Sequence, residues 1–247
     1  MLPRKITALL LLALTTASLS AQNPPAQKPV NPDQLPGLPS PKENDIMCRC
    51  VSTFLPGKNE TFFFKIDDTY HEVSLTGEGM SLPFPVRGST TFTLYKKTPA
   101  GEDAPPYTPV VEQALSGDGK DFLVFLSRKN DKAPMKSKSV NLNTSSYPAN
   151  NIYLFNESPA ALGLQVNTSK AVVKPFESFN YKFQNTDRDT YTSAKIVMRY
   201  KGENKVMASK RLRLVPGRRI ILVAFPSKAR TQLGATPLRL IITQDQP

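Results

Sequence analysis

The sequence has few of the residues on which catalytic and metal sites depend. It contains one histidine, two cysteines and no tryptophan among 247 residues. His71 is the only imidazole and no G-x-S-x-G motif accompanies it, so a Ser–His hydrolase triad is not predicted. Cys48 and Cys50 lack the further ligands of a zinc site, and no glycine-rich phosphate loop is present. We therefore predict a protein that is not an enzyme and that carries no cofactor or metal ion.

The two cysteines are separated by one residue at the start of a predicted strand. Residues i and i+2 of a strand point to the same side, with Cα atoms roughly 6.5 Å apart, near the upper limit of disulfide geometry. An internal bridge would be strained. We favour two buried thiols, with an intermolecular bridge as the alternative.

Long hydrophobic runs are also missing. The apolar run from Ile6 to Leu14 follows a basic start and precedes small residues ending at Ala21, which is the pattern of a secretory signal peptide. No later stretch reaches about 18 consecutive apolar residues. We expect residues 1–21 to be cleaved, with an uncleaved anchor as the alternative. The mature chain is then periplasmic or extracellular and has no transmembrane segment.

Proline marks the boundary of the folded region. Residues 22–46 hold seven of the 23 prolines and almost no large apolar side chains. Such a segment buries too little surface to offset its ordering entropy, so we expect a disordered linker. The rest of the chain is long enough for two domains of about 100 residues, which we assign to 47–149 and 150–247.

The second half of the chain reads as a diverged copy of the first half. A period of about 100 residues indicates two tandem domains rather than a solenoid of small units. Val51 is matched with Ile152, Ile66 with Val166, and the offset stays between 98 and 105. The matched segments are 51–66 with 152–166, 94–96 with 199–201, and 123–129 with 222–228.

Apolar residues in both halves alternate with period two or form short runs between Pro, Gly, Asn and Asp. No window favours an amphipathic helix. Seven or eight short strands in each half predict an all-β protein of two tandem immunoglobulin-like antiparallel β-sandwich domains. A Greek-key barrel is the second choice.

The positive charge is concentrated in the second half. Residues 47–149 hold 12 basic and 11 acidic residues, whereas 150–247 hold 16 basic and 6 acidic residues. On predicted strands 194–201 and 205–215, alternation places most basic side chains opposite an apolar face that includes Val206. The residues expected to bind an anionic partner are Lys195, Arg199, Lys201, Arg211, Arg213, Arg218 and Arg219.

A contiguous basic face attracts polyanions. We therefore expect an exported, non-catalytic binding or structural module that contacts an anionic glycan, an envelope polyanion or an acidic secreted protein. Export argues against nucleic acid as the target. A solvated face without a partner is one alternative. Another is a periplasmic assembly factor or chaperone-like protein that acts by β-strand addition.

Three segments of the second half resemble a known group of proteins. They read N-I-Y-L-F-N-E-S (151–158), P-F-E-S (175–178) and L-V-P-G-R-R-I-I-L-V (214–223). They are similar to uncharacterised secreted β-sandwich proteins of verrucomicrobial-type bacteria. The resemblance covers roughly residues 150–225 and implies an export-associated β-sandwich without a known active site.

Overall fold

Strands make up all the regular structure of the described residues, among which no helix occurs. The computed structural model describes residues 38–53, 59–76, 79–99, 105–128, 133–183, 187–200, 202–226, 230–231, 234–235 and 238–245. The predicted signal peptide and the linker up to residue 37 lie outside them. Nothing in the described part of the chain is a helix long and apolar enough to cross a membrane.

The strands of the first half run from β1 to β8. They are β1 (Ile46–Ser52), β2 (Asn59–Ile66), β3 (Thr69–Thr76), β4 (Phe84–Val86), β5 (Thr91–Lys97), β6 (Tyr107–Ala114), β7 (Asp121–Ser127) and β8 (Lys136–Asn141).

The strands of the second half run from β9 to β18. They are β9 (Asn151–Asn156), β10 (Leu162–Val166), β11 (Ser169–Val173), β12 (Ser178–Lys182), β13 (Thr190–Tyr200), β14 (Glu203–Leu214), β15 (Arg219–Pro226), β16 (Arg230–Thr231), β17 (Gly234–Ala235) and β18 (Leu238–Asp245).

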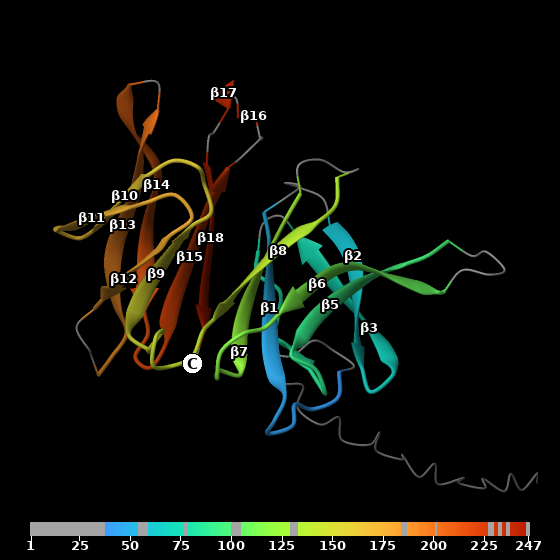
Figure 1. The fold of residues 1–247 in the computed structure, drawn as a ribbon. Coiled ribbons are helices and arrows are strands. Elements are labelled where there is room, and N and C mark those ends of the chain that lie inside the picture. The colour runs from blue at the N-terminus through green and yellow to red at the C-terminus, as the bar shows by residue number, and fades with distance from the viewer. Residues whose placement is uncertain are drawn as a thin grey trace, which may run out of the picture. The chain divides into compact units, whose positions relative to one another are not determined.

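The two halves have the same sheet topology (Figure 1). The first half forms the sheets β4-β1-β7-β8 and β3-β2-β5-β6, and the second half forms β12-β9-β15-β18 and β11-β10-β13-β14 together with the additional two-stranded sheet β16-β17. This confirms the predicted all-β architecture of two β-sandwiches. The sheets are not purely antiparallel, because β1 pairs parallel with β7 and β9 pairs parallel with β15.

The repeat is present in the structure, but its register differs from the sequence match. Cys48 lies opposite Phe122 in β1–β7, and Ile152 lies opposite Ile220 in β9–β15. The match of Val51 with Ile152 is therefore wrong, and the two side chains enter different cores. Because side chains alternate along a strand, an alignment shifted by an odd number of residues exchanges the two faces.

Both halves carry a β-bulge at the same place. The β5–β6 pairing shifts between Leu94 and Tyr95, and the β13–β14 pairing shifts between Ile196 and Val197. In β14 the extra residue is Met207, which reverses the alternation beyond it. Val206, expected on the core face, is consequently turned outward and is 60% exposed.

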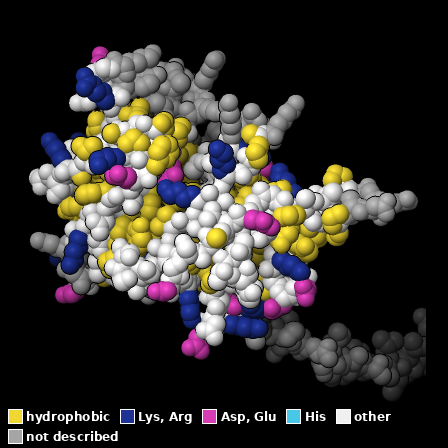
Figure 2. All heavy atoms as spheres, viewed as in Figure 1, with side chains coloured by type: hydrophobic (Ala, Val, Ile, Leu, Met, Phe, Trp, Pro, Cys, Tyr) yellow, Lys and Arg dark blue, Asp and Glu magenta, His cyan; other side chains and the backbone are white. Residues whose placement is uncertain are grey.

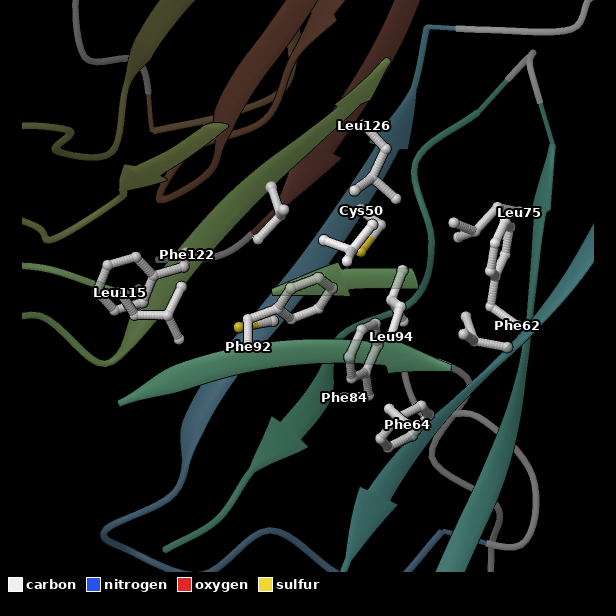
Figure 3. Packing of buried hydrophobic residues seen from close by; sticks show 14 of the residues in the cluster. Cys50, Phe62, Phe64, Leu75, Phe84, Phe92, Leu94, Leu115, Phe122 and Leu126 are labelled. Carbon is white, nitrogen blue, oxygen red and sulfur yellow. The ribbon is translucent and has the colours of Figure 1, made fainter. Parts of the chain in front are cut away.

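The first sandwich is filled by aliphatic and aromatic side chains from both of its sheets. Figure 3 shows Phe84, Phe92 and Leu94 around Cys50, and the rings of Phe64 and Phe84 stack with centroids 4.3 Å apart. Cys48 and Cys50 are both fully buried free thiols, which confirms the preferred interpretation. Burial in an apolar core raises the pKa of both thiols.

The linker's described end is attached to this sandwich. Leu38 packs against the first core, and β1 begins at Ile46. Asp45 is buried and accepts hydrogen bonds from Arg87 at 2.8 and 2.9 Å. Residues 38–46 therefore belong to the folded region rather than to a disordered linker.

A third core joins the two sandwiches, and both halves belong to one compact unit. It is built from the outer faces of β4-β1-β7-β8 and β12-β9-β15-β18. The rings of Phe125 and Phe155 meet there with centroids 5.6 Å apart. The strands β7, β9 and β15 inside these two sheets are thus buried on both faces, which explains the continuous apolar runs of β7 and β15.

An ion pair between the buried Arg219 and the partly exposed Asp121 closes one side of the third core. Arg219 is 0% exposed and donates from Nη2 to Asp121 Oδ2 at 2.5 Å. Its Nη1 donates to the carbonyl oxygens of Leu142 at 2.8 Å and Tyr147 at 3.1 Å. The other carboxylate oxygen of Asp121 accepts from Arg49 Nη1 at 2.5 Å. One carboxylate thereby bridges arginines from both halves.

The thiols provide a first test of this packing. We expect neither Cys48 nor Cys50 to react with a water-soluble disulfide reagent in the native protein, because both are buried and protonated. Both should react once the protein is unfolded in guanidinium chloride. Titration of reactive thiols with and without denaturant checks this, and rapid labelling of the native protein would contradict it.

The ion pair between the halves provides a second test. Asp121→Asn should lower the free energy of unfolding by about 3 kcal/mol, because it removes the carboxylate charge that the buried Arg219 contacts. Asp189→Asn is the matched control, since it removes the exposed partner of Arg213 and should cost less than about 1 kcal/mol. Denaturant unfolding measures both free energies. An equal decrease in the two variants would show that the Asp121–Arg219 pair contributes no more to stability than an exposed pair does.

Candidate functional site

The outer face of the sheet β11-β10-β13-β14 holds most of the residues expected to bind an anion. Leu164, Ala194 and Ile196 point inward to the second core. The alternate residues of β13, including Lys195 and Arg199, therefore point outward and are exposed. We call this side of the sheet the basic face.

Register places the exposed cations of β14 beside those of β13. Arg213 lies opposite Tyr191 and Arg211 opposite Ser193, whereas Lys195 lies opposite Ser209. All these side chains lie on one side of two adjacent strands. In Figure 2, separate Lys and Arg side chains lie along the side of the molecule where Figure 1 places the second sandwich.

One cation of the face could not be found from the parity of the predicted strands 194–201 and 205–215. Lys170 on β11 lies opposite Gln165 on β10, and Gln165 lies opposite Lys195 on β13. Lys170 is exposed and stands in the same row as Lys195. A match across three strands needs their register, which strand parity alone does not supply.

Three of the expected residues are not part of this face. Arg219 shares its parity with Ile221 and Val223, which enter the third core, so it is buried and the expectation that it binds an external anion is wrong. Arg218 is exposed but lies in the turn that crosses from β14 to β15. Lys201 lies outside the described residues. The structure therefore brings together Lys195, Arg199, Arg211 and Arg213.

The four cations differ in how they are held. Arg213 donates from Nε to Asp189 Oδ2 at 2.7 Å, and this contact raises the pKa of Arg213. The Arg211 guanidinium lies 4.2 Å from the ring centroid of Tyr191, a cation–π contact along the sheet. Within the described residues, no carboxylate is within salt-bridge distance of Lys195, Arg199 or Arg211. These three charges are therefore available to an external anion.

A hollow in the first sandwich is the main alternative site. It has a volume of about 360 Å³ and is lined by residues that include Asp67, Arg87 and Tyr95. Arg87 pairs with both Asp45 and Asp67, and Lys65 Nζ lies 2.7 Å from Asp68 Oδ1. The charged groups around the hollow thus pair with one another near the β2–β3 turn and stabilise the local structure.

Residues suited to catalysis or metal binding do not converge in the described part of the chain. His71 on β3 is half-buried, and its ring lies 5.7 Å from that of Phe64. Among the described residues, no three His, Cys, Asp or Glu side chains gather in a group that could hold a metal ion.

Comparison with known proteins adds no family. No protein-family model matches the chain, and a search of curated proteins finds no relative. Function is therefore inferred from the geometry and charge of the basic face.

The Asp45–Arg87 pair gives a pH-dependent prediction. Hydrogen bonding to Arg87 lowers the pKa of Asp45 below its ordinary value of 3.8. The pair's contribution to stability is therefore present above this value and is lost as the pH falls through the lowered folded-state pKa. Wild type should be more stable than Asp45→Asn at about pH 6, and the difference should shrink toward about pH 2.

Thermal unfolding of both proteins across this pH range measures the difference. Asp68→Asn is the control, because Asp68 makes only an exposed ion pair with Lys65 and should change stability little at any pH. A difference between wild type and Asp45→Asn that stays constant down to the lowest pH would contradict the assignment.

Proposed function

We propose that the protein is an exported, non-catalytic binding module that docks on an anionic surface through the basic face of its second sandwich. The observation that supports this most directly is the set of three exposed cations, Lys195, Arg199 and Arg211, beside which the described residues place no carboxylate. The half of the chain that carries them holds 16 basic and 6 acidic residues.

Strand geometry gives this face a regular charge pattern. Outward residues on one strand are roughly 7 Å apart, and neighbouring strands are about 4.8 Å apart. Lys195, Arg199 and Arg211 therefore form an array on one side of the sheet in which several cations can contact an extended polyanion together. Their attraction for it weakens as salt screens the charges.

Strand addition is a second candidate function. β14 is twelve residues long and stands at the end of its sheet, and no described strand pairs with its outer edge. Such an edge offers main-chain donors and acceptors to an incoming strand. A partner bound in this way would be held by backbone hydrogen bonds, so its binding would survive salt that removes a polyanion.

Heparin chromatography tests the proposed function. Lys195→Glu combined with Arg199→Glu should elute at much lower salt than wild type, because it reverses two unpaired cations of the face. The matched control is Lys97→Glu with Lys136→Glu, two exposed residues of the first sandwich with the same total change in charge. The control should elute close to wild type.

Equal elution of both double variants would show that retention follows net charge alone, and it would contradict the assignment to this face. Retention of a partner protein at high salt, unaffected by the charge reversal, would favour strand addition instead.

A further inference from the structure

An apolar row crosses the basic face from one edge to the other. Val172 on β11 lies opposite Gly163 on β10, Gly163 lies opposite Val197 on β13, and Val197 lies opposite Val206 on β14. The two outer members are strongly exposed, Val172 at 74% and Val206 at 60%. The row contains no polar side chain.

Cations stand on both sides of this row. Lys170 and Lys195 lie two residues away from it in one direction along β11 and β13, and Arg199 lies two residues away in the other. Of the six exposed large hydrophobic residues in the described part of the chain, three lie on this sheet and a fourth, Phe176, lies in the turn after β11. The face is therefore amphipathic rather than simply basic.

The equivalent row in the first sandwich consists of Glu72, Phe63, Tyr95 and Pro109, and its two central members pack against neighbouring rings. Phe63 and Tyr95 lie opposite each other there, and both are only half-exposed. Tyr107 packs on Phe63 at 4.9 Å, Tyr70 packs on Tyr95 at 5.1 Å, and Tyr70 stacks on Tyr107 at 3.9 Å between ring centroids. The row thus carries half-exposed aromatic rings between the exposed residues Glu72 and Pro109 in the first copy, whereas in the second copy it carries no polar side chain.

The apolar row favours one of two kinds of anionic partner over the other. A soluble polyanion such as a sulfated glycan supplies charge but nothing that would remove Val172 and Val206 from water. The interface of a lipid bilayer supplies phosphate groups for the cations and an apolar layer beneath them for the valines. Tyr191 on the same face suits such an interface, where tyrosine is enriched.

We propose that the basic face binds the surface of a lipid bilayer that carries anionic headgroups, with the valine row seated below the level of the phosphates. This inference rests on the proposed function and names the partner of the same face. The cations attract the protein to the surface, and the valine row holds it there once the salt-dependent attraction is screened.

Co-sedimentation with vesicles tests the inference. The full chain should bind vesicles of phosphatidylcholine mixed with phosphatidylglycerol and should bind pure phosphatidylcholine much less. Val172→Ser with Val206→Ser should weaken binding to the mixed vesicles about tenfold, because it removes most of the apolar surface of the row. Its elution from heparin should be unchanged, because the cations stay in place.

Leu82→Ser is the matched control, since Leu82 is an exposed apolar residue of the first sandwich, and it should bind as wild type does. All variants share the apolar segment at the N-terminus, so differences among them report on the face. The charge-reversed variant with Lys195→Glu and Arg199→Glu should lose both vesicle and heparin binding.

The outcomes separate the two levels of the proposal. The bilayer proposal is contradicted if the variant with Val172→Ser and Val206→Ser binds vesicles as well as wild type does. It is also contradicted if wild type is retained on heparin but does not bind vesicles. In both cases a soluble polyanion remains as the partner. If the wild-type protein is not retained on heparin, the proposed function itself is overturned.

Discussion

The core between the two sandwiches is the constraint on which the rest of the structure depends. It covers the outer faces of β4-β1-β7-β8 and β12-β9-β15-β18 along their inner strands, so that β7, β9 and β15 are buried on both faces. Asp121 and Arg219 complete it, and they occupy equivalent positions as the first residues of β7 and β15. A duplicated position has thus acquired opposite charges in its two copies and pairs across the junction.

The alternation of apolar and polar residues in the sequence is enough to predict the fold class, the repeat and the outward direction of Lys195 and Arg199. Alternation also predicts that Cys48 and Cys50 share one buried face. Arg219 could not be placed in the same way. It follows Arg218 in a basic turn, and only the pairing of β15 with β9 shows that its side chain points into the third core.

The bulge at Met207 marks a second limit of reasoning from the sequence. The bulge cannot be recognised from the residues of β14 themselves, but beyond Met207 it reverses which side chains point outward. Val206 then joins the outer surface, and the apolar row across the basic face is complete. Recognising that row requires the register of four strands at once, which no single segment of the sequence contains.

The parallel pairs β1–β7 and β9–β15 also determine the order in which the chain can fold. Met47 meets Asp121, and Ile152 meets Ile220, so each sandwich joins a strand from its beginning to one near its end. Neither sandwich can close before most of its chain has been made. The junction must wait longer still, because its arginine arrives with β15. Such long-range closure makes folding slow, and until it is complete the apolar strands β1 and β7 lack their final cover.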